Sequence, residues 1–290
     1  MKEKIVSFLK AIGYIAVAYV IQVIITLIYG FCYMFIIMSK FGIENLESSS
    51  EEIFLAFSNG LDKNMNFILL ISAAAYVVIL MLLYRIGKKS MIIDFGLKNK
   101  NTKNWIISIF LGLAVWLINT GFVSLVQDLG FMQKYFQTFN ELTSSTVQGT
   151  IFMTILAGGI IVPFAEEFLF RGIVQRTLSK SMSVKSAIII QGVLFGIYHG
   201  NVIQGLYATF LGIVFGYVVY KSKSLWTSVI MHMVNNTTAF IAYYVLPQSI
   251  DNLTGYIVFA LIGMVILVVS LSYFNKNNLV VEEGNEVIRL

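Results

Sequence analysis

The amino-acid sequence predicts an all-α integral membrane protein with about eight transmembrane helices. Hydrophobic residues make up 58% of the 290 residues and charged residues only 12%, whereas soluble domains contain about 45–50% and about 25%. A soluble protein of this length would lack the polar residues needed to cover its surface. The net charge of +5 comes from basic residues in short clusters between long apolar runs. Such clusters set membrane topology, so we expect no nucleic-acid partner.

The predicted helices follow from apolar runs of about 20 residues, the length that crosses the hydrocarbon core. The first run follows a basic start and is too long for a cleavable signal, so we expect a retained membrane helix. The fifth and sixth runs are short and nearly meet at Gly200. The eight predicted spans are 11–38, 67–86, 104–126, 150–175, 186–200, 203–220, 225–246 and 254–274.

Lysine and arginine residues predict the orientation of these spans. With the N-terminus in the cytoplasm, every Lys and Arg except Lys40, Lys63 and Lys134 falls on the cytoplasmic side, as the positive-inside rule requires. The first outer loop is acidic instead. It contains Glu44, Glu47, Glu51, Glu52 and Asp62. We therefore predict a multi-pass protein of the cell membrane with both termini in the cytoplasm.

The span 150–175 contains two adjacent carboxylates. Glu166 and Glu167 lie about ten residues, or some 15 Å, from its cytoplasmic end, and each charge near the bilayer centre costs about 2.5–3.5 kcal/mol. Glu167 and Arg171 are four residues apart, so they can form an ion pair on one helix face. Glu166 is left without that partner. A purely structural ion pair would need only one acid, so we interpret the second as functional.

Pro163 lies four residues before Glu167 and removes one helical hydrogen bond. Together with the glycine pair at 158–159, it predicts that the helix kinks or starts afresh. Irregular backbone at membrane depth is tolerated where it lines a water-filled cavity, so we expect a cavity beside the two glutamates.

The chain has only two histidines, and both His199 and His232 fall inside predicted spans. Asn236 lies one turn after His232 on the same helix face. His199 follows glycines spaced four residues apart over 192–200, which let a neighbouring helix approach closely. Counted from the cytoplasmic ends, Glu166, His199 and His232 can share one plane near the middle of the membrane. We therefore expect one site inside the helix bundle.

Two carboxylates, two imidazoles and an amide suit hydrolysis by an activated water. Glu166 is the expected general base, although Glu167 can exchange that role with it, and a histidine orients the water or shares its proton. His232 and Asn236 can donate hydrogen bonds to the oxyanion. In the alternative version, His199, His232 and a glutamate bind zinc and leave one position open for water. The sequence leaves the cofactor unknown, because it contains no His-Glu-x-x-His helix.

These residues form three motifs in chain order: Glu166-Glu167-x-x-x-Arg171, Phe195-x-x-x-His199 and His232-x-x-x-Asn236. Together they resemble the motifs of the CAAX protease and bacteriocin-processing (CPBP, or Abi) family of intramembrane proteases, over about residues 160–240. The resemblance implies that Glu166 activates water with His199, while His232 and Asn236 contact the oxyanion or the water. The family is often labelled as metalloproteases, and a metal-free glutamate mechanism has also been proposed for it. All three motifs are intact, which argues against an inactive member.

The predicted function is an intramembrane endopeptidase that cuts a membrane-associated peptide or protein. The alternatives are a non-proteolytic membrane scaffold that regulates a sensor kinase or an envelope enzyme, a bacteriocin self-immunity protein, and a proton-coupled transporter. Transporters usually show repeated halves, and the sequence shows none. We expect spans 1–3 and the acidic outer loop in residues 1–149, the CPBP/Abi catalytic spans 4–7 in 150–246, and the last span with a cytoplasmic tail in 247–290.

Overall fold

The computed structural model describes residues 1–41, 50–87, 90–246 and 253–277, and the regular elements within these ranges are all helices. They are α1 (Lys2–Phe41), α2 (Ser50–Lys63), α3 (Met65–Ile86), α4 (Met91–Asp94), α5 (Thr102–Asp128), α6 (Gln133–Val147), α7 (Ile151–Thr154), η2 (Ile155–Ile161), α8 (Val162–Glu167), η3 (Phe168–Val174), α9 (Gln175–Ser179), α10 (Val184–Tyr198), α11 (Val202–Ser222), α12 (Leu225–Val245) and α13 (Leu253–Asn277). The predicted loop residues Glu44, Glu47, Lys88 and Lys89 and the tail 278–290 with Arg289 lie outside the described residues.

The prediction of a helical membrane protein is confirmed. Each of the eight predicted ranges coincides with one helix or with the continuous helical run 151–179. Within the described ranges, six helical segments are long and apolar enough to cross a membrane, namely α1, α3, α5, the run 151–179, α11 and α13. Helix α10 spans 15 residues, about 22 Å at 1.5 Å per residue, which is shorter than the hydrocarbon core. The count of eight spans therefore stays a prediction.

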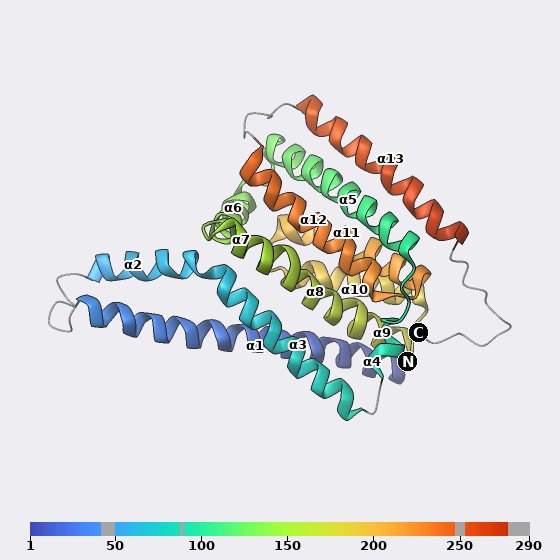
Figure 1. Cartoon of the computed structure of the whole chain (residues 1–290), viewed down its shortest axis with the longest axis horizontal. Coiled ribbons are helices and arrows are strands. Elements are labelled where there is room, and N and C mark those ends of the chain that lie inside the picture. Colours follow the sequence, from blue (N-terminus) through green and yellow to red (C-terminus); the bar gives the residue numbers. More distant parts are fainter. Residues whose placement is uncertain (42–49, 88–89, 247–252, 278–290) are drawn as a thin grey trace.

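The helices form a layered bundle around the run 151–179, which we call the central helix (Figure 1). Helix α5 packs between α13 and α12, and α12 packs against η2 and α8 of the central helix. On the opposite side, α3 contacts η2 and α8, and α1 crosses α3. The α10–α11 hairpin lies behind this layer in Figure 1. The central helix is thus enclosed by packed helices, which is where a buried membrane site can form.

Helices α2 and α6 were not predicted from the sequence. Both are polar, and neither contains an apolar run of membrane length. The sequence pattern therefore predicts only loops between the first and second spans and between the third and fourth. The two helices contact each other, and Ser145 Oγ of α6 donates to Asp62 Oδ1 of α2 at 2.9 Å. Helix α6 also buries Phe136 and Val147. It contacts α3, α7 and α11 at the end of the bundle where the central helix begins (Figure 1).

The predicted close helix approach at the glycine row is confirmed. A Cβ on Gly192 would lie 2.7 Å from the Ile213 side chain, and a Cβ on Gly196 would lie 2.5 Å from the carbonyl oxygen of Gly205. Contacts this short leave no room for any other residue, so glycine permits α10 and α11 to pack backbone against backbone. This packing fixes the end of α10, directly before His199.

The segment after α4 supports the central helix from one end of the bundle. Phe95 is fully buried, and its ring lies 5.2 Å from that of Phe168 in η3. A Cβ on Gly172 would lie 2.9 Å from the Phe95 ring. The Phe95 carbonyl oxygen also accepts a hydrogen bond from Leu225 N at the start of α12. One aromatic residue therefore links the helices that carry the two glutamates and His232.

Candidate active site

The central helix continues through Pro163 without starting afresh, and the predicted kink stays a prediction. It continues through two π-helical segments, η2 and η3, on either side of α8. In η2 the Val162 N–H donates to the Ala157 carbonyl, five residues earlier. By the same spacing, the carbonyl of Gly158 faces Pro163, which has no N–H. Asn236 Nδ2 of α12 donates to the Gly158 oxygen at 3.0 Å instead. The helix thus continues past Pro163 although one backbone hydrogen bond is missing. π-Helical turns of this kind occur frequently at functional sites.

The Glu167 carboxylate contacts two side chains, the Arg171 guanidinium and the His232 imidazole. Arg171 Nη1 lies 2.7 Å from Glu167 Oε1, and both side chains are fully buried, so the predicted ion pair is confirmed. The same oxygen lies 2.8 Å from His232 Nδ1. Because the paired carboxylate can only accept, His232 Nδ1 carries the proton. The Arg171 guanidinium also lies over the rings of Phe195 and Phe215, at 4.4 and 5.3 Å from Cζ to the ring centroids.

Glu166 points in a different direction from Glu167 and has a partner that the sequence did not predict. Its Oε2 lies 3.7 Å from His232 Nε2, a little beyond hydrogen-bond length. The sequence predicted only that Glu166 does not share the Arg171 partner of Glu167, and Arg171 does pair with Glu167. The contact with His232 comes from another helix. The imidazole of His232 lies between the two adjacent carboxylates.

His199 lies directly after α10 and reaches the same region. Its Nδ1 is 2.8 Å from the Phe195 carbonyl oxygen, which can only accept, so Nδ1 is protonated and Nε2 remains for other contacts. The fully buried ring of Phe195 packs edge-on against both imidazoles, at 4.7 Å from His199 and 5.8 Å from His232. The turn ends at Gly200, whose φ of +67° is readily adopted by glycine. Phe195 and Gly200 therefore position His199.

A chain of amide side chains extends from the site towards α5. Asn236 Oδ1 accepts from Asn235 Nδ2 at 2.9 Å, and Asn235 Oδ1 accepts from Asn119 Nδ2 at 3.4 Å. With the bond to Gly158, these contacts fix the orientation of the Asn236 amide. Asn236 therefore uses one of its two N–H groups for structure.

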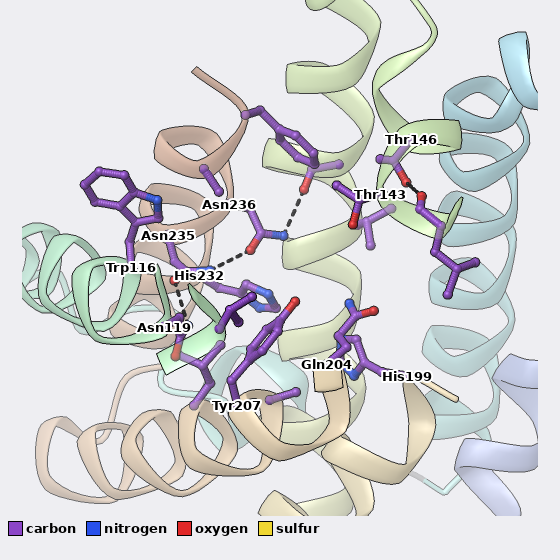
Figure 2. A pocket seen from close by; sticks show the side chains of 18 of the residues that line it. Trp116, Asn119, Thr143, Thr146, His199, Gln204, Tyr207, His232, Asn235 and Asn236 are labelled. Atoms are coloured by element: carbon purple, nitrogen blue, oxygen red, sulfur yellow. Dashed lines mark hydrogen bonds between the residues drawn. The ribbon is translucent and has the colours of Figure 1, made fainter. Parts of the chain in front are cut away.

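A cavity of about 470 Å³ connects these residues (Figure 2). Glu166, His199, His232 and Asn236 all line it, whereas Glu167 and Arg171 lie behind its wall. Figure 2 shows the Tyr207 hydroxyl pointing into the cavity near His232 and Gln204. Apart from Glu166 and the two histidines, the lining side chains are uncharged. The predicted cavity beside the glutamates is present, within the size range of ligand pockets.

The arrangement does not form the zinc site considered from the sequence. Within the described ranges, no three His, Cys, Asp or Glu side chains are grouped so that they could hold a metal ion. The reason is geometric, because His232 is engaged by Glu167 while His199 lies on another wall with its Nδ1 on a backbone carbonyl.

Three cavity residues were missed by the sequence reasoning. Asn119 and Asn235 are polar residues inside predicted spans, and the cost of burying an amide in hydrocarbon could have drawn attention to them. Tyr207 gave no signal, since tyrosine is common in membrane helices near the interfaces. It lines the same cavity as Glu166.

Fold and site together define a helical membrane protein with an acid–imidazole–amide cluster in a cavity between its helices. Residues 147–238, less than half of the chain, match the family model described as type II CAAX prenyl endopeptidase Rce1-like. The chain is also 25% identical over 209 residues to a Bacillus subtilis (strain 168) protein named "Putative membrane peptidase YdiL", covering 69% of this chain and 78% of that protein. No solved structure matches the chain. The resemblance to the CPBP family is thereby confirmed, and the matches support a membrane protease.

Proposed function

We propose that this protein is an intramembrane endopeptidase that hydrolyses a peptide bond of a membrane-associated peptide or protein with a water activated by Glu166. One observation carries the proposal. The His232 imidazole lies between the carboxylates of Glu166 and Glu167, on the wall of a cavity that His199 also lines. An acid and two imidazoles around one cavity are the groups that activation of water requires.

Glu166 is the proposed general base, and Glu167 is a positioning residue. Glu167 is fully buried behind the cavity wall, and one of its oxygens is bound to both Arg171 and His232. Glu166 lines the cavity and is 8% exposed, so a water molecule can reach its carboxylate. We therefore assign the role of base to Glu166, whereas the sequence allowed either glutamate to take it.

The reaction needs one water and returns its protons to the products. Glu166 accepts a proton as the water oxygen attacks the carbonyl carbon of the scissile peptide bond. The resulting oxyanion is stabilised by the second N–H group of Asn236, as preorganised donors do in acyl transfer. The Nδ1 proton of His232 is bound to Glu167, so His232 adds a donor only through Nε2, once that nitrogen takes up a proton. His199 hydrogen-bonds the attacking water and helps deliver the proton to the leaving nitrogen as the carbon–nitrogen bond breaks. The products are a carboxylic acid and an amine.

The cavity favours an uncharged substrate segment. Aromatic and aliphatic side chains, including Trp116, Phe139 and Leu142, share its lining with amides and hydroxyls such as Gln204 and Thr143. The apolar groups suit a hydrophobic segment that enters from the bilayer, and the amides can bond its main chain. We propose the lipid bilayer and such a peptide or membrane protein as the partners.

The orientation with both termini in the cytoplasm is part of the proposal. It is supported by the basic residues that cluster between the helices. Glu3 of α1 and Leu271 of α13 line one common groove, so the beginning of the first helix and the last turns of α13 lie at the same end of the bundle.

The proposal is tested with purified protein in liposomes that carry a library of hydrophobic peptides, with cleavage products identified by mass spectrometry. Glu166→Gln removes the base and keeps the side-chain shape, so we expect cleavage to fall by about 10²–10⁴-fold. Glu141→Gln, at an exposed position on α6, is the matched control and should cleave normally. Comparing membrane and secreted peptides of cells with wild-type protein or Glu166→Ala identifies natural substrates.

Two outcomes would contradict the peptidase. If Glu166→Gln cleaves as fast as the control, the proposed base is wrong. If no peptide is cleaved by any form while Glu166→Gln and Glu166→Ala lower only the amount of folded protein, the residues serve a scaffold, which is the alternative considered from the sequence. Size-exclusion profiles of all variants separate these two cases.

A further inference from the structure

A second cavity, separate from the candidate active site, lies at one end of the bundle. It measures about 1090 Å³, slightly more than the 300–1,000 Å³ typical of small-molecule sites. It shares no lining residue with the active-site cavity. Its walls come from the start of α1, the turn between α9 and α10, and parts of α10, α11 and α13. We call it the end groove.

The end groove is polar at one end and apolar along its length. Its polar end is the turn 179–183, which contributes three serines and Lys180, followed by Lys185 in the first turn of α10. Its apolar walls include Ile188 and Ile189 of α10, Ile213 and Val214 of α11, and Leu271 of α13. A ligand that fills it must therefore have a polar head and an apolar chain.

The charge around the polar end favours an anionic head. Among the described residues that line the groove, Lys180 and Lys185 are basic and Glu3 is acidic. A third cation, Lys221, lies with its Nζ 5.9 Å from the ring centroid of Tyr217, another lining residue. The N-terminus of the 15-residue helix α10 points at the same turn and adds the partial positive charge of the helix dipole.

The position of the groove matches a membrane–water interface. The central helix ends at Ser179 and α11 ends at Ser222, while α1 begins at Lys2. The polar turn thus lies where these segments leave the apolar layer, and the apolar walls continue into it. Basic residues at this level attract anionic lipids.

We propose that the end groove binds an anionic phospholipid, with the phosphate at Lys180, Lys185 and the start of α10 and an acyl chain along α10, α11 and α13. A soluble anion would use only the lysines and the turn, and it would leave the apolar walls without a ligand. This site does not depend on the peptidase activity.

The test measures lipid retention by the full-length protein in neutral detergent at low salt, using native mass spectrometry with phosphatidylglycerol and phosphatidylcholine of equal chain length. We expect preferential retention of phosphatidylglycerol. The variant Lys180→Gln/Lys185→Gln should lose about 25-fold in affinity for it, at roughly fivefold per lysine. The matched control Lys98→Gln/Lys100→Gln, at two exposed lysines of another loop, should bind as the wild type does.

Two further measurements separate the acyl-chain and head-group contributions. Ile189→Trp narrows the space between the apolar walls without changing the charge, so it should weaken retention of phosphatidylglycerol. Inorganic phosphate should not shift the unfolding midpoint of the wild type or of any variant. Equal retention of the two lipids by the wild type would overturn the proposal. So would an equal loss in the control double variant, or a thermal shift with inorganic phosphate as large as that with phosphatidylglycerol.

Discussion

Replacing Arg171 by methionine should destabilise the protein strongly, because it leaves a buried carboxylate without its cation. Arg171 and Glu167 are both fully buried, and Nη1 and Oε1 are 2.7 Å apart. Removing one member of a buried pair costs about 3–5 kcal/mol. In this site the variant leaves the Glu167 carboxylate buried without its cation. A second carboxylate, Glu166, lies beside it and contacts the same histidine.

The assay is thermal unfolding of purified protein in one detergent. For a chain of this size, 1 kcal/mol corresponds to about 2–4 °C, so Arg171→Met should lower the unfolding midpoint by about 6–20 °C. Arg85→Met is the matched control, because Arg85 lies exposed in the last turn of α3. Its loss should shift the midpoint by no more than a degree or two.

A double variant gives the sharper test. Glu167→Gln removes the negative charge and keeps an oxygen that accepts from His232 Nδ1, so Arg171→Met/Glu167→Gln should recover most of the lost stability. A coupling of this size is expected only for residues in direct contact. If Arg171→Met leaves the midpoint unchanged, or if the double variant is as unstable as the sum of the single changes, the ion pair does not stabilise this site.

Three further predictions concern other parts of the molecule. Gly196→Ala should cost about 1–3 kcal/mol, because its Cβ would lie 2.5 Å from a carbonyl oxygen of α11, whereas Gly13→Ala meets nothing within 4 Å; equal unfolding midpoints for the two would argue against the close crossing. Phe95→Ala should cost about 3–5 kcal/mol through the cavity that it leaves, while the exposed Phe54→Ala should be neutral, and an equal effect of both in thermal unfolding would contradict the supporting role of the buried ring. His199→Gln should slow peptide cleavage in liposomes by about 10²–10⁴-fold with little change in the unfolding midpoint, and a normal rate would exclude its proposed role.

Most of the membrane helices could be predicted because the signal is local. An apolar run of about 20 residues has few alternatives in a bilayer, and the i,i+4 spacing of Glu167 and Arg171 determines their contact within one helix. Helices α2 and α6 lacked that signal. They are stabilised by contacts to distant residues, such as the bond from Ser145 to Asp62, which no window of sequence contains.

The candidate site could be predicted as a set of residues but not as an arrangement. The sequence indicated that Glu166, His199 and His232 lie at similar depth, with Asn236 one turn after His232, and all four do line one cavity. His232 contacts both glutamates, and it lies 65 positions after Glu167 in the sequence. This contact therefore depends on how α12 packs against the central helix. The same holds for Asn236, whose bond to Gly158 arises only because Pro163 leaves that carbonyl without a helical donor.

The different proposed roles of two adjacent glutamates follow from helix geometry. Neighbouring residues on a helix are about 100° apart, so when Glu167 faces Arg171 and the interior, Glu166 must face elsewhere. The buried charge of Glu167 is compensated by a cation and an imidazole, and this compensation orients His232 with its second nitrogen towards Glu166. Glu166 faces the cavity, where water and substrate are the proposed partners of its carboxylate. A single carboxylate could not both hold the imidazole in this orientation and accept a proton from water, which is a physical reason for the adjacent pair.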